Sequence, residues 1–91
     1  MNGQWKEISD SLTLAAGTYI TVGVCAKAVT YLRISKHDNV ENTLLASPNG
    51  NLIVGQVTVP SGGIRVRLWA YSATSLTVGV GEAKMFLVKI A

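Results

Sequence analysis

Along residues 64–71, apolar side chains alternate with arginine or aromatic side chains. This alternation is the strongest chemical signal in the sequence. Arg65, Arg67, Trp69 and Tyr71 fall on one side of an extended segment, because successive side chains of a strand point to opposite faces. Aromatic rings supply a large apolar area, and arginine stacks on rings and forms forked hydrogen bonds, so both residue types are enriched where proteins bind other molecules. We therefore expect this side of the strand to contact a partner or a ligand.

Three uses of that side are open from the residues alone. It can be an interface between subunits, a platform for a saccharide, or an outer sheet surface on which arginine stems cover the rings. Tyr31 and Arg33 alternate in the same way within residues 29–36, and they extend the surface if their strand lies alongside. The interface candidates are Arg65, Tyr31 and Arg33.

A polar segment, residues 37–51, is expected to form a long loop, and loops of this length often carry function. Sugar sites pair an aromatic ring, which stacks on a pyranose, with carboxylate and amide groups that bind its hydroxyl groups. The candidates for binding a saccharide, taken from the strand and the loop together, are Trp69, Tyr71, Arg67, His37, Asp38, Asn39 and Glu41.

The sequence offers little for catalysis or for a metal ion. His37 is the only histidine and lies next to Asp38, whereas a catalytic base is oriented by groups that are usually distant in the sequence. His37, Asp38 and Glu41 could bind a metal ion only if the loop folded back on itself, and the spacing of a calcium loop is absent. Cys25 lies within an apolar strand, where a free cysteine behaves as a small hydrophobe. We predict a protein that is not an enzyme and uses no metal or cofactor.

The elements that must position these residues are strands, because apolar and polar side chains alternate with a period of two. A turn at residues 60–63 (PSGG) is expected to join two of them in a hairpin, and residues 72–75 are expected to form a second hairpin. The expected strands lie at residues 5–14, 18–26, 29–36, 52–59, 64–71, 76–80 and 84–90. Short strands joined by glycine-bearing turns indicate an all-β fold, an antiparallel, jelly-roll-like β-sandwich of about seven to eight strands in one domain, residues 1–91.

The composition predicts an oligomer. Apolar residues make up 48% of the chain and charged residues 14%, against a usual charged share of roughly 25%. A lone subunit with this balance exposes large apolar patches, which mark contact surfaces. The net charge of +3 includes no basic run, which argues against nucleic acid binding. The charge-free stretch at residues 11–26 is too short for a membrane helix, so we expect a soluble protein without membrane insertion.

Three stretches resemble a known family: residues 14–22 (LAAGTYITV), residues 59–70 (VPSGGIRVRLWA) and the apolar strand at residues 86–91 (FLVKIA). They are similar to the C-terminal domains of bacteriophage tail-fibre and receptor-binding proteins, which are small β-sandwiches related in shape to the trimeric C1q and tumour necrosis factor folds. The likeness runs from about residue 12 to residue 91, although no binding motif of the family can be matched residue by residue.

The resemblance implies a homotrimer in the virion, carried on a tail fibre and touching a saccharide of the host cell surface. Two other hypotheses stay open. The chain can be a purely structural trimerisation or capping module of a fibre, or a lectin-like domain unrelated to phage.

Overall fold

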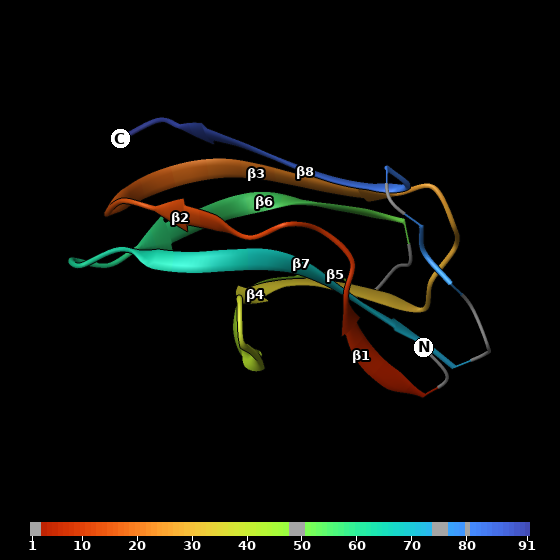
Figure 1. Ribbon diagram of the computed structural model, residues 1–91. Helices are drawn as coiled ribbons and strands as arrows, with labels where there is room; N and C mark the ends of the chain where they lie inside the picture. Colours follow the sequence, from red (N-terminus) through yellow and green to blue (C-terminus); the bar gives the residue numbers. More distant parts are fainter. Residues whose placement is uncertain (1–2, 48–50, 74–76, 80) are drawn as a thin grey trace.

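The computed structural model describes residues 3–47, 51–73, 77–79 and 81–91, and in these residues eight strands form two antiparallel sheets that pack face to face (Figure 1). The larger sheet contains β1 (Gln4–Glu7), β2 (Leu12–Leu14), β4 (Tyr31–Lys36), β5 (Asn39–Ser47) and β7 (Ile64–Ser72). The smaller sheet contains β3 (Gly17–Cys25), β6 (Leu52–Val59) and β8 (Ala83–Lys89). The predicted all-β sandwich is confirmed. None of the described residues belongs to a helix that is long and apolar enough to cross a bilayer.

Strand β7 is central to the larger sheet. The strand order there is β1-β7-β4-β5, with β2 pairing to β7 further along the same edge, and the order in the smaller sheet is β6-β3-β8. Every connection except β1–β2 and β4–β5 passes from one sheet to the other. Such crossings are typical of jelly-roll and Greek-key sandwiches.

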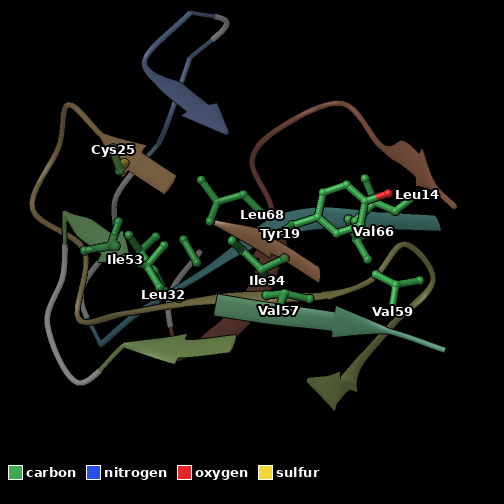
Figure 2. Close-up of a cluster of buried hydrophobic side chains, with 12 residues drawn as sticks. Leu14, Tyr19, Cys25, Leu32, Ile34, Ile53, Val57, Val59, Val66 and Leu68 are labelled. Atoms are coloured by element: carbon green, nitrogen blue, oxygen red, sulfur yellow. The ribbon is translucent and has the colours of Figure 1, made fainter. Parts of the chain in front are cut away.

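The hydrophobic core lies between the two sheets, as Figure 2 shows. Leu32 and Ile34 of β4 and Leu68 of β7 are fully buried, and they face Ile53 and Val57 of β6. The alternation predicted for β7 is confirmed, because its apolar side chains point inward and its arginine and aromatic side chains point outward.

In β3 the more apolar side faces away from the core. Tyr19, Thr21 and Cys25 point inward, so Ile20 and Val22 point outward. The Tyr19 hydroxyl donates to the Ala15 carbonyl at 2.8 Å, which satisfies the phenol at the margin of the core.

Two glycines allow the smaller sheet to approach its neighbours. A Cβ atom at Gly23 would lie 2.6 Å from Cγ2 of Ile53 and 2.9 Å from Cδ1 of Leu68 in the opposite sheet. A Cβ atom at Gly55 would lie 2.7 Å from Cδ1 of Leu45. Leucine side chains from the larger sheet therefore fill the space above both glycines.

The expectation of a long loop at residues 37–51 is wrong for residues 39–47, which form β5, and residues 48–50 of the expected loop lie outside the described residues. The chain turns tightly at His37 and Asp38 and returns as β5, which pairs with β4 with register shifts between Ile34 and Lys36. The polar composition of residues 39–43 concealed the strand, because β5 is an edge strand whose first half exposes side chains on both sides.

The two hairpins are also corrected. The 60–63 turn is present, with Gly62 and Gly63 at positive φ and the Gly63 N–H donating to the Pro60 carbonyl at 3.1 Å. It joins strands of different sheets, since β6 pairs with β3 and β7 pairs with β1, β2 and β4. A strand was also expected at residues 76–80. Residues 77–79 do not form a strand, and Leu76 and Val80 lie outside the described residues.

The strand expected at residues 5–14 is divided into β1 and β2, which both pair with β7. Between them, the Ile8 N–H donates to the Leu68 carbonyl at 3.0 Å, and the Leu68 N–H donates to the Ser9 hydroxyl at 2.9 Å. The serine side chain thus replaces a backbone carbonyl at the interruption.

Thr21 places a hydroxyl in the core without a hydrogen-bond partner among the described residues, and its side chain is fully buried. An unpaired buried hydroxyl costs about 1–3 kcal/mol. We expect Thr21→Val to raise the free energy of unfolding by about 1 kcal/mol in urea titrations, while the exposed Thr58→Val changes it by less than about 0.5 kcal/mol. A loss of stability in Thr21→Val would show that the hydroxyl has a partner.

Candidate functional site

Three aromatic rings lie in a row across the outer face of the larger sheet. Trp5 of β1 and Tyr31 of β4 both pair with Tyr71 of β7, which lies between them. The ring centroids of Trp5 and Tyr71 are 5.6 Å apart with an interplanar angle of 52°, and those of Tyr31 and Tyr71 are 6.0 Å apart at 39°. Tyr31 and Arg33 therefore extend the outer side of β7, as the alternation predicted.

The rings border a hollow of about 570 Å³. We call it the aromatic hollow, and its lining residues are Trp5, Tyr31, Leu32, Arg33, Ala46, Ser47 and Tyr71. The Arg33 guanidinium carbon lies 4.4 Å from the centroid of the Trp5 ring, a distance at which a cation is attracted to the ring face. A volume of this size falls within the range of ordinary small-molecule sites.

Arg33 supplies the polar chemistry of the aromatic hollow. Its Nη1 lies 3.8 Å from Oε2 of Glu41, and both side chains are partly or largely exposed, so the pair contributes little to stability. A guanidinium has five N–H donors in a fixed plane. The contact with Glu41 leaves most of them available, so Arg33 can donate to hydroxyl groups of a ligand whose apolar surface stacks on the rings.

Trp69, a predicted ligand residue, lies outside the aromatic hollow. It is 8% exposed, and its indole N–H donates to the carbonyl of Lys36, at the end of β4, at 3.2 Å. The indole thus packs within the sheet surface and holds β4 against β7. A side chain so covered presents little of its ring to a ligand, and Trp69 does not line the aromatic hollow.

Arg65 and Arg67 also contact the protein itself. Arg67 Nη1 donates to Oε2 of Glu7 on β1 at 3.4 Å, and Arg65 Nε donates to the Ser11 hydroxyl at 2.7 Å. Both arginines therefore secure the N-terminal segment to β7. They lie outside the lining of the aromatic hollow.

The polar candidates around the β4–β5 turn are spread apart. Asp38 contacts Lys36 at 3.5 Å and His37 at 3.9 Å, and the Asn39 side chain accepts from the Glu41 N–H at 3.1 Å. Of the four candidates, Glu41 reaches the aromatic hollow, through Arg33. In the part of the chain that the structure describes, no three His, Cys, Asp or Glu side chains converge to hold a metal ion.

Cys25 belongs to the core, as predicted. Its burial raises the pKa of the thiol above its ordinary value. The thiolate is the nucleophilic form of cysteine, so the neutral thiol serves in packing.

The residue that sequence reasoning missed is Trp5. Its position in the aromatic hollow depends on the pairing of β1 with β7, whose partners are distant in the sequence. The available signal was its residue type, because the indole of a tryptophan is a natural stacking partner for other aromatic rings.

Comparisons with known proteins give no independent lead on the aromatic hollow. No protein-family model matches the chain, and neither does any curated protein or solved structure.

Proposed function

We propose that the chain is a non-enzymatic adhesion module that binds a saccharide in the aromatic hollow. The observation that carries the proposal is the row of three rings, drawn from three strands, beside an arginine that lies over one of them. The tail-fibre resemblance supplies the setting, in which a homotrimer on a virion contacts a saccharide of the host cell surface.

The chemistry of the aromatic hollow favours a sugar over a nucleic acid. The axial hydrogens of a pyranose give it an apolar face that packs on an aromatic ring, while its hydroxyl groups accept hydrogen bonds from donors such as a guanidinium. Single-stranded nucleic acids also stack on rings, but they require a basic groove that follows the phosphates. Arg33 is the one cation that lines the described hollow, and Glu41 lies against it.

The proposal is tested by screening the protein on a glycan array and measuring the affinity of the best glycan by calorimetry. Tyr31 is 44% exposed, so Tyr31→Ala removes a ring from the hollow with little effect on packing. We expect Tyr31→Ala to weaken binding at least about tenfold, which corresponds to about 1.4 kcal/mol. Arg33→Lys should also weaken binding, because lysine keeps the charge but loses the forked donors.

The control is Thr58→Ala, an exposed residue on the outer side of β6 in the other sheet, which should leave the affinity unchanged. A protein that binds no glycan on the array contradicts the proposal. So does a glycan whose affinity is the same for wild type and Tyr31→Ala. Binding of single-stranded oligonucleotides at physiological salt, with no glycan bound, would instead identify a nucleic acid site.

The structural alternative assigns the rings to contacts between subunits. It predicts that Tyr31→Ala lowers the oligomer mass in light scattering and affects no ligand. The adhesion proposal predicts the reverse, an unchanged mass with weakened binding, whether or not the module belongs to a phage.

A further inference from the structure

The outer face of the smaller sheet is unusually apolar for a surface in water. Large apolar side chains here have exposed fractions between 40% and 63%; they are Ile20, Leu52, Val54, Phe86, Val88 and Ile90. We call this surface the apolar face. It lies on the opposite side of the sandwich from the aromatic hollow, because each belongs to the outer side of a different sheet (Figure 1).

The strand register makes the apolar face continuous. Val22 of β3 pairs with Val54 of β6 on one side and with Phe86 of β8 on the other. In the next row Ile20 pairs with Val88, beside Gln56. Since side chains paired across neighbouring strands touch on one face of a sheet, these rows form one uninterrupted patch.

Charge is confined to the margin of this patch. Lys84 pairs with Val24 at one end of β8. The structure describes all the residues that pair in these rows, and Lys84 is the one charged side chain among them. The patch therefore lacks the charged groups by which a surface selects an acidic or a basic partner.

The exposed area of the apolar face approaches the area that each partner buries in a standard interface. Half-exposed side chains of this size present on the order of 100 Å² each, so the named six present about 600 Å², against about 800 Å² per partner in a standard interface. The partly exposed Val22 and Val24 add to this area. The largest apolar patch of an ordinary monomer spans about 300–600 Å².

We propose that copies of this chain associate through the apolar face. An uncharged apolar patch is best buried against another of the same kind, and three copies related by a threefold axis bring their apolar faces together around that axis. The inference rests on the proposed homo-oligomer and names the face that forms it. It also leaves the aromatic hollow open on the outside of the assembly, where a saccharide can reach it.

The test is the mass of the protein in solution, measured by size-exclusion chromatography with light scattering. Val88 is 63% exposed on β8, where it pairs with Ile20 of β3 within the patch, so Val88→Lys leaves the core untouched and places a charge in each buried copy of the interface. We expect wild type to have the mass of three chains and Val88→Lys to have the mass of one. A second variant, Val54→Lys on β6, should behave in the same way, and circular dichroism checks that both variants are folded.

The matched control is Tyr31→Lys, which introduces the same charge at a comparably exposed site on the other sheet, and it should keep the wild-type mass. A wild-type mass of two chains that falls to one in Val88→Lys supports the face and contradicts threefold symmetry. A monomeric wild type overturns the inference, as does Val88→Lys with an unchanged mass. If the monomer instead sediments with phosphatidylcholine vesicles, the apolar face binds lipid. Glycan binding is measured separately, so failure of the assembly and failure of the adhesion proposal give different results.

Discussion

Replacing Gly23 with valine is expected to lower the free energy of unfolding by about 3 kcal/mol, at the upper end of the usual cost of overpacking a core. The Ile53 and Leu68 atoms that a Cβ would meet belong to side chains that are themselves buried in the core, so neither can move aside cheaply. A domain of this size is stable by only about 5–15 kcal/mol, so the loss is large. Urea unfolding followed by circular dichroism measures it.

A double-mutant cycle identifies the cause of that loss. Ile53→Leu removes the Cγ2 methyl group that a new Cβ at position 23 would meet. We therefore expect Gly23→Ala to cost less in the Ile53→Leu background than in wild type. Equal costs in the two backgrounds would show that the destabilisation arises elsewhere, since uncoupled sites are additive.

Trp69→Ala is expected to destabilise the fold by about 3–5 kcal/mol, because it removes a large buried side chain. Trp69→Phe keeps a ring but loses the hydrogen bond to the Lys36 carbonyl, so its cost should be nearer about 1 kcal/mol. Thermal unfolding followed by far-ultraviolet circular dichroism compares the two variants.

The same pair of variants separates a packing role from a binding role. Trp69→Phe should keep the wild-type affinity for the glycan, because Trp69 does not line the aromatic hollow. If Trp69→Phe keeps its stability but loses glycan binding, Trp69 belongs to the binding site. In that case the indole would have to turn outward on binding.

Local patterns in the sequence predicted much of the fold. The alternation in β7 identified both the buried and the outward side chains, and the PSGG segment forms the predicted turn. The pairing between strands was not predictable in the same way. A turn sequence predicts that the chain reverses direction, but it does not predict whether the next strand joins the same sheet or the opposite one.

The candidate site was predicted in part. The alternation within strands singled out Tyr71 as a ligand residue and Tyr31 and Arg33 as interface residues, and all three line the aromatic hollow. Trp69 belongs to the same alternation but is covered, since exposure depends on neighbours that the sequence does not place. Trp5 is brought to the hollow by the distant pairing of β1 with β7.

The composition predicted exposed apolar surface without giving its position. The aromatic strand was the natural candidate for a subunit contact, yet the larger apolar surface lies on the smaller sheet. The reason is visible in β3, where Gly23 and Thr21 occupy the crowded inner side and the valine and isoleucine side chains are left outside.

The central position of β7 governs how the chain can reach this fold. Because β7 pairs with β1, β2 and β4, the larger sheet stays incomplete during synthesis until residue 72 has emerged. Strand pairings between distant segments form slowly, so the earlier strands keep unpaired edges and exposed apolar side chains until β7 pairs with them. Chains in this state are prone to aggregation. The yield of native protein should therefore depend on growth temperature and on chaperones more than the small size of the chain suggests.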